Sequence, residues 1–179
     1  MDSEILHSIH QATANPFFDA VFPYLTMLGE AGAVWIVIGV CLLVSRQYRF
    51  WGIVMLATLA FVGLFDELLI KHIVARPRPF VADPSIQLIV SPPSGYSFPS
   101  GHTTTSIASA VIISLMPIKN GWKAGAWVLA ITLAFTRLYL FVHYPSDVLV
   151  GALLGVIYGY LAVKIGFALQ RRRQSKQEA

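Results

Sequence analysis

The segment Val148–Leu169 reads VLVGALLGVIYGYLAVKIGFAL, and Lys164 is its only charged residue. A helix rises about 1.5 Å per residue, so roughly 20 apolar residues cross the ~30 Å hydrocarbon core of a bilayer. This segment has that length and composition, and the basic run from Arg171 to Arg173 follows it directly. Because cations concentrate where a membrane helix enters the cytoplasm, the sequence predicts a membrane-spanning helix here.

The rest of the chain has a similar character. Of its 179 residues, 56% are hydrophobic and 12% are charged, and the mean hydropathy is +0.66. Soluble domains carry about 25% charged residues. We therefore expect an all-α, polytopic membrane protein with a single transmembrane domain, residues 1–179. The six expected spans are Pro16–Leu28, Ala31–Val44, Phe50–Ile70, Thr103–Met116, Trp122–Leu140 and Val148–Leu169.

Residues 1–14 differ from the spans in their pattern. Ile5, Leu6 and Ile9 fall on one side of a helix, polar residues occupy the other sides, and Pro16 marks a break. This pattern predicts a short amphipathic helix that lies at the membrane interface. The chain lacks basic clusters interleaved with aromatic residues, so no nucleic-acid partner is expected.

Lys and Arg residues are distributed unevenly between the two sides of the six-span layout. One side receives Arg46, Arg49, Lys119, Lys123 and the basic tail 170–179. By the excess of cations this side is the cytoplasm. The loop 75–99 and the turn at His143 then face outward. Lys71, Arg76 and Arg78 break the charge rule on that outer side, which indicates a function for them.

Three polar clusters lie at the outer ends of expected spans. They are Lys71 to Pro79 after the third span, Pro99-Ser100-Gly101-His102 before the fourth, and Arg137, His143 and Asp147 around the turn between the fifth and sixth. The topology therefore brings all three clusters to one face of the bundle.

The first two clusters and Arg137 have the chemistry of an anion site. Lys71, Arg78 and Arg137 are cations, and the arginine fork matches phosphate oxygens. Ser100 and Gly101 precede a helix, so backbone N–H groups and the positive end of the helix dipole point toward the same place. Together these residues predict a phosphate-binding site.

Two histidines add acid–base and nucleophilic chemistry. Asp147 lies four residues after His143 and can hold one ring N–H, which makes the other ring nitrogen a better nucleophile. His102 can protonate the departing oxygen. We expect a phosphohistidine intermediate that water hydrolyses, with no metal and no cofactor, because the side-chain cations stabilise the charge of the transferred phosphoryl group.

The three clusters resemble the signature motifs of a known family. Lys71-x6-Arg78-Pro79, Pro99-Ser100-Gly101-His102 and Arg137-x5-His143-x3-Asp147 are similar to the motifs of the type 2 phosphatidic acid phosphatases. That family is the membrane branch of the superfamily that includes acid phosphatases and vanadium haloperoxidases. One departure is Thr136, where the family usually has Ser, and a hydroxyl is retained.

The resemblance implies roles for the motif residues. It makes His143 the nucleophile, His102 the acid and Asp147 the partner that orients His143. It also assigns phosphate binding to Lys71, Arg78, Ser100, Gly101 and Arg137.

Other residues near the motifs are interpreted separately. Glu67 lies four residues before Lys71, so we expect a helical ion pair that positions the lysine. Thr103 is a candidate for a first-turn hydroxyl contact with the phosphate. Arg76 falls outside the motif spacing and is expected to contact the surface or lipid headgroups. Taken singly, Asp147 also fits a helix cap.

The resemblance implies a metal-independent lipid phosphatase of the bacterial cell envelope. The small chain is most similar to enzymes that convert undecaprenyl diphosphate to undecaprenyl phosphate, with phosphatidylglycerophosphate and phosphatidate as alternative substrates. A phosphotransferase and a non-catalytic lipid binder or transporter stay open. We expect a multi-pass protein of the inner (plasma) membrane, with its site facing the extracytoplasmic side and no obligate protein partner.

Overall fold

The computed structural model describes residues 1–177, and within that range all regular structure is helical. The helices in chain order are α1 (Asp2–Thr13), α2 (Pro16–Leu28), η1 (Glu30–Gly32), α3 (Ala33–Val44), α4 (Arg49–Val62), η2 (Gly63–Ile70), α5 (Lys71–Val74), α6 (Pro79–Ala82), α7 (Gly101–Leu115), α8 (Asn120–Tyr139) and α9 (Pro145–Gln177). The predicted all-α class is confirmed.

Most helix boundaries lie close to the predicted ones. The third expected span is a continuous run of α4, η2 and α5, and η2 has π-helical hydrogen bonding. The loop 75–99 contains one short helix, α6, which begins at Pro79 because the fixed proline φ suits the first helical position. Helix α9 continues past Leu169 through the basic tail as far as Gln177, and residues 178–179 of the predicted tail lie outside the described residues.

The described helices give fewer candidate membrane spans than the six that the sequence predicts. Among the described residues, two stretches are long and apolar enough to cross a membrane, Arg49–Ala82 and Pro145–Lys176. A third results if the pair Pro16–Leu28 and Glu30–Val44, bent by 45°, counts as one span. The six-span layout therefore stays a prediction.

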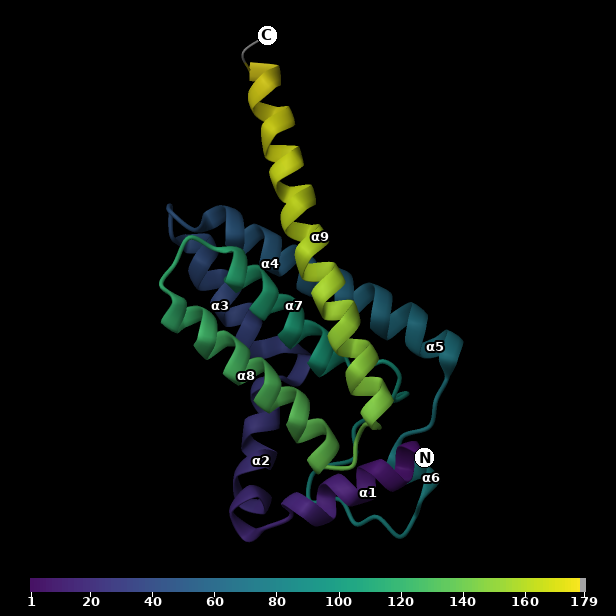
Figure 1. The fold of residues 1–179 in the computed structure, drawn as a ribbon. Coiled ribbons are helices and arrows are strands. Elements are labelled where there is room, and N and C mark those ends of the chain that lie inside the picture. Colours follow the sequence, from purple (N-terminus) through teal and green to yellow (C-terminus); the bar gives the residue numbers. More distant parts are fainter. Residues whose placement is uncertain (178–179) are drawn as a thin grey trace.

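Helix α7 is the central helix of the bundle, with α4, α8 and α9 packed around it (Figure 1). The indole of Trp35 is fully buried and donates to the Ser106 hydroxyl at 2.9 Å. Trp127 of α8 donates in the same way to Ser114 at 2.8 Å. These bonds give both indole N–H groups an acceptor within the bundle, as burial requires.

Glycines allow α9 to approach α7 closely. A Cβ atom added at Gly151, Gly155 or Gly159 would lie 2.9, 2.8 or 2.7 Å from a backbone carbonyl oxygen in or just before α7. Their four-residue spacing places them on one face of α9, the pattern that lets membrane helices pack at short range. The contact also joins the starts of the two helices, because the Ser100 amide donates to the Asp147 carbonyl at 3.1 Å.

Helix α1 packs against the end of the bundle at which α8 ends and α9 begins. Leu6 is fully buried against Phe141 and Tyr144, whereas its neighbour Ile5 is about half exposed. A helix is present over the predicted segment, and its place at a membrane interface stays a prediction. Its apolar side contacts protein, so α1 lies next to the turn that carries His143.

We expect Gly155→Ala to destabilise the protein by about 1–3 kcal/mol, because the added methyl group overlaps the backbone of α7 and forces the helices apart. Gly125→Ala is the matched control, since a Cβ there meets nothing within 4 Å. Thermal unfolding in detergent measures both variants. Equal melting temperatures for the two would contradict the proposed role of the α7–α9 contact.

Candidate active site

A cavity of about 400 Å³ lies at the start of α7 and brings together residues from all three sequence clusters. The predicted site residues on its wall are Glu67, Lys71, Arg78, Gly101, His102, Arg137 and His143. They belong to five parts of the chain: the helical run from α4 to α5, the segment just before α6, helix α7, helix α8, and the turn between α8 and α9. The cavity is therefore formed only when the bundle is assembled.

The three cations of the cavity are buried. Lys71, Arg78 and Arg137 have relative exposures of 6%, 4% and 4%. The Lys71 ammonium forms the ion pair that the spacing predicts, 2.7 Å from a Glu67 carboxylate oxygen. Glu67 is half exposed, so it offsets one of the three charges only in part. A net positive charge in a buried cavity favours binding of an anion.

Arg78 is held by backbone carbonyls. Its guanidinium donates to the carbonyl oxygens of Gly95, Ser94 and Val142 at 3.1, 3.0 and 2.9 Å. The Nη1 atom also lies 3.2 Å from Nε2 of His143. Carbonyl groups fix the guanidinium without neutralising it, so Arg78 keeps its charge next to the histidine.

Arg137 is held from the other side of the cavity. Its Nη1 donates to the Thr26 hydroxyl at 2.5 Å, and its Nε has no hydrogen-bond partner in the protein. A buried guanidinium with a free donor is an expected feature of a site that binds an oxyanion. Thr26 belongs to α2, which the sequence motifs do not include.

His143 lies in the turn before α9 and is 2% exposed. Helix α9 begins at Pro145, and the His143 Nδ1 atom is 3.6 Å from Oδ2 of Asp147, longer than a hydrogen bond. The pKa of His143 lies well below its ordinary value because the ring is buried and cations, above all Arg137 and Arg78, surround it. The imidazole is thus neutral, the form that can act as a nucleophile.

His102 is the second residue of α7, and its Nε2 is buried without a hydrogen-bond partner. The nearest acid is Glu30, with a carboxylate oxygen 3.9 Å away. The ring packs on Gly29, where a Cβ atom would lie 2.7 Å from the histidine Cδ2. Gly29 thus contributes to the site, although the sequence indicated only a break between spans there.

Ser100 and Thr103 do not line the cavity, and their predicted contact with phosphate stays a prediction. Both are fully buried, and the Thr103 hydroxyl donates to the Ser100 hydroxyl at 3.0 Å. The close approach of α9 at Gly151 covers this side of α7. Of the predicted residues at the start of α7, Gly101 and His102 line the cavity.

Arg76 corrects the sequence interpretation, which placed it at the surface. Its Nη1 lies 2.7 Å from the Asp147 carboxylate, and its Nη2 lies 2.6 Å from Asp2. The side chain is 26% exposed and its guanidinium lies 3.9 Å from the centre of the Tyr144 ring. Asp147 is consequently shared between Arg76 and His143.

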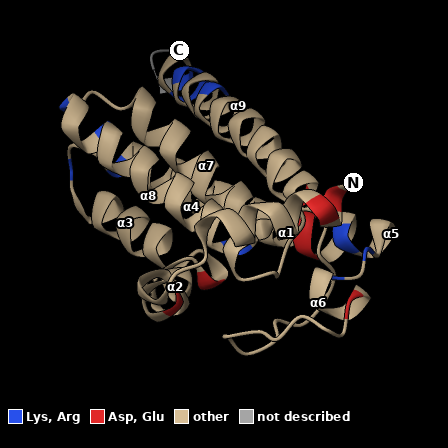
Figure 2. Ribbon diagram, turned by 60° about the horizontal axis from the view of Figure 1, so that its bottom comes forward, with Lys and Arg blue, Asp and Glu red and all other residues tan. Residues whose placement is uncertain are grey.

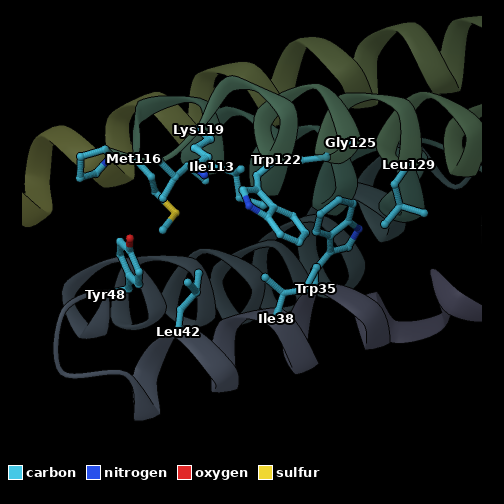
Figure 3. Close-up of a pocket in the computed structure, with 13 residues that line it drawn as sticks. Trp35, Ile38, Leu42, Tyr48, Ile113, Met116, Lys119, Trp122, Gly125 and Leu129 are labelled. Carbon is cyan, nitrogen blue, oxygen red and sulfur yellow. The ribbon is translucent and has the colours of Figure 1, made fainter.

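A larger cavity of about 990 Å³ lies at the opposite ends of α7 and α8, between them and α3 (Figure 3). Its wall is apolar and aromatic, as Leu42, Trp35 and Trp122 illustrate, and Lys119 is its one charged lining residue. It holds neither histidine nor arginine. Of the two cavities, the smaller one carries the cations that binding of a phosphate requires.

The helical bundle thus brings two histidines and three buried cations to one cavity. Residues 51–171, about two thirds of the chain, match the PAP2 superfamily. The chain belongs to this superfamily and is a lipid phosphatase.

Curated relatives specify the similarity further. The chain is 36% identical over 152 residues to a decaprenylphosphoryl-5-phosphoribose phosphatase of Mycobacterium tuberculosis, covering 84% of this chain and 81% of the relative. It is 28% identical over 166 residues to the undecaprenyl-diphosphatase BcrC of Bacillus subtilis, covering 90% and 82%.

Solved structures have the same fold. The Aquifex aeolicus protein LpxE matches with a TM-score of 0.75 and 28% identity, over 91% of this chain and 94% of that one. A transmembrane PAP2-type phosphatidylglycerolphosphate phosphatase from Bacillus subtilis matches with a TM-score of 0.72 and 26% identity, over 92% and 83%.

We expect Gly29→Ala to lower kcat about a hundredfold, because the new methyl group displaces the His102 ring by the small distance that such catalysis does not tolerate. Gly63→Ala adds the same group to the wall of the same cavity but meets nothing within 4 Å, and it should keep its activity. Release of phosphate from a lipid phosphate in detergent measures both. Similar rates for the two variants would show that Gly29 does not seat the histidine.

Proposed function

We propose that the protein hydrolyses a polyprenyl phosphate or diphosphate, with undecaprenyl diphosphate as the specific substrate and undecaprenyl phosphate as the product. The observation that carries the proposal is the basic cavity with two histidines on its wall. Support for the lipid class comes from the relatives, since those from Mycobacterium and Bacillus are named for polyprenyl substrates.

Substrate binding would use the buried cations. Lys71, Arg78 and Arg137 would surround the oxygens of the terminal phosphoryl group, with the Gly101 region at the helix start adding backbone donors. Because these groups are already held in place before the substrate arrives, little reorganisation is needed as charge develops in the transition state.

The first chemical step would form a bond from Nε2 of His143 to phosphorus. That nitrogen lies 3.2 Å from Nη1 of Arg78, so it would be beside a phosphate that Arg78 binds. The bond from phosphorus to the leaving oxygen breaks, and His102, as the imidazolium, donates a proton to that oxygen. Burial and the neighbouring cations lower the pKa of His102 in the free protein, so the negative charge of the bound phosphoryl group would have to favour the imidazolium first. Asp147, 3.6 Å from Nδ1, would stabilise the positive charge that the ring acquires.

The second step would reverse these roles. His102 takes a proton from a water molecule, the water oxygen bonds to phosphorus, and the bond between phosphorus and Nε2 breaks. Inorganic phosphate leaves, and His143 is again neutral. No step requires a metal, and the three side-chain cations supply the electrostatic stabilisation.

A second candidate substrate is a polyprenyl-phosphate-linked sugar phosphate. The specific observation is the 36% identity to the mycobacterial decaprenylphosphoryl-5-phosphoribose phosphatase over most of both chains. Both candidates share a phosphoryl group and a polyprenyl chain, and they differ in the group next to the leaving oxygen. Phosphatidylglycerophosphate and phosphatidate are the diacyl alternatives.

We further propose the membrane arrangement that the sequence predicts, with a change in the span count. One domain would lie in the inner (plasma) membrane, with the active-site loop 75–99 outside. Six spans would put residues 1–14 on the side of the basic tail, but α1 packs beside the turn that carries His143. The span count would therefore change from six to five, with α2 and α3 as one bent span. Basic residues gather at the end of α9 and at the neighbouring ends of α3 and α8 (Figure 2), which favours that end as the cytoplasmic one.

His143→Ala should lower kcat by about a thousandfold or more, because the nucleophile is lost. The assay is phosphate release from undecaprenyl diphosphate in detergent with EDTA, in which the wild-type protein should keep full activity. His72→Ala is the control, since His72 is exposed and is not part of the cavity wall.

Three other lipids, decaprenylphosphoryl-5-phosphoribose, phosphatidylglycerophosphate and phosphatidate, are compared in the same assay. The proposal requires the largest kcat/KM for undecaprenyl diphosphate. Full turnover by His143→Ala would reject the phosphohistidine mechanism, and product bearing phosphate on another acceptor would identify a phosphotransferase.

The orientation can be tested with single cysteines, since Cys41 is the only native one. In a Cys41→Ser background, Ser91→Cys in the outer loop should react with a membrane-impermeant maleimide in intact cells. Ser175→Cys at the end of α9 should react only after the cells are lysed. The reverse pattern would place the active site on the cytoplasmic side.

A further inference from the structure

Next to His143, three charged residues form a cluster that links the start of α9 to the first turn of α1. They are Asp147, Arg76 and Asp2. Arg76 follows the end of α5, and its carbonyl accepts the Ser97 amide at 2.9 Å, which fixes its backbone next to the second motif. From there its guanidinium extends to Asp147 on one side and to Asp2 on the other, at 2.7 and 2.6 Å.

Both oxygens of the Asp147 carboxylate are occupied. Oδ1 accepts from Arg76, and Oδ2 accepts the Tyr144 amide at 2.9 Å. The carboxylate is completely buried, so it needs a counter-ion to remain ionised. Arg76 is that counter-ion, and with the Tyr144 amide it determines where Oδ2 lies relative to His143.

Asp2 holds Arg76 from the other side. Its carboxylate also accepts the Ser146 amide at 3.2 Å and a short hydrogen bond from the Ser146 hydroxyl. Burial alone would raise the pKa of Asp2, but the hydrogen bonds from Ser146 and Arg76 outweigh it and lower the pKa below its ordinary value. Asp2 is thus ionised at neutral pH, and Figure 2 shows acidic and basic segments together at the N-terminal end of α1.

We propose that Arg76 and Asp2 are positioning residues for the reaction, a clamp that fixes the Asp147 carboxylate behind His143. The inference rests on the proposed roles of His143 and Asp147. It makes the N-terminal helix α1 part of the active site, although the helix lies outside the region 51–171 that matches the family.

The charges explain why two residues are needed. A guanidinium that faced Asp147 alone would attract its carboxylate with full strength and compete with the developing imidazolium of His143. Placed between two carboxylates, Arg76 divides its interaction between Asp2 and Asp147. The clamp therefore orients Asp147 and still leaves its negative charge available when His143 becomes positive.

The test is a double-mutant cycle with Arg76→Gln and Asp2→Asn. We expect Arg76→Gln to lower kcat about ten- to a hundredfold with KM changed by less than about threefold, because the nucleophile is misoriented while the phosphate-binding cations are untouched. Arg76→Lys keeps the charge and should recover part of the rate. Asp2→Asn should lower kcat severalfold.

The decisive measurement is Asp2→Asn in the Arg76→Gln background, where it should lower kcat by a smaller factor than in the wild-type background, since the part of its effect that passes through Arg76 is already lost and only its bonds to Ser146 remain. Glu4→Gln is the matched control, because Glu4 lies in the same turn of α1, is highly exposed, and pairs only with the N-terminal amine. It should behave as the wild-type protein. Melting temperatures in detergent establish that every variant is folded.

Two results would overturn the clamp. Additive losses in the double variant would mean that α1 supports the fold without acting through Arg76, and a rise in KM at constant kcat would mean that these residues bind substrate. His143→Ala, measured in parallel, tests the proposed mechanism separately. If it keeps turnover, the phosphohistidine step is wrong, whereas the coupling between Asp2 and Arg76 is judged by the cycle alone.

Discussion

The close contact between α7 and α9 is the constraint on which the active site depends. Three glycines on one face of α9 let its backbone approach that of α7, and the helix starts then share a backbone hydrogen bond between Ser100 and Asp147. Because His102 lies at one start and His143 just before the other, the distance between the two helices determines whether both imidazoles can face one phosphoryl group. A larger residue at the contact would separate them.

The same arrangement explains how the protein keeps positive charge inside a helical bundle. Arg78 is held by carbonyl oxygens, Arg137 by the Thr26 hydroxyl and Lys71 by a half-exposed carboxylate. These partners satisfy donors but leave most of the charge unneutralised. A buried cation of this kind costs folding energy, which is offset elsewhere in the core, and an oxyanion that enters the cavity gains the full interaction. The buried cations thus lower the folding stability of the protein, and they give it a binding site that is already organised for an anion.

Much of the fold and site could be predicted from the chain. Proline and glycine breaks placed α2 at Pro16–Leu28, and the four-residue spacing of Glu67 and Lys71 indicated their ion pair. Local patterns carry this information because helix ends and neighbours one turn apart depend on nearby residues alone. The sequence interpretation missed Gly29 and misplaced Arg76. Their partners, His102 and Asp147, lie about seventy residues away, so no local pattern could reveal these contacts.

The amino-acid sequence by itself determined the helical class, most helix boundaries, the family resemblance and the set of chemically active side chains. Only the tertiary structure decided which of those side chains line the cavity, and Ser100 and Thr103 are not among them. It also decided that the first turn of the chain meets the last helix, through Asp2, Arg76 and Asp147. The physical reason is that residue type sets what a side chain can do, whereas helix packing sets what it can touch.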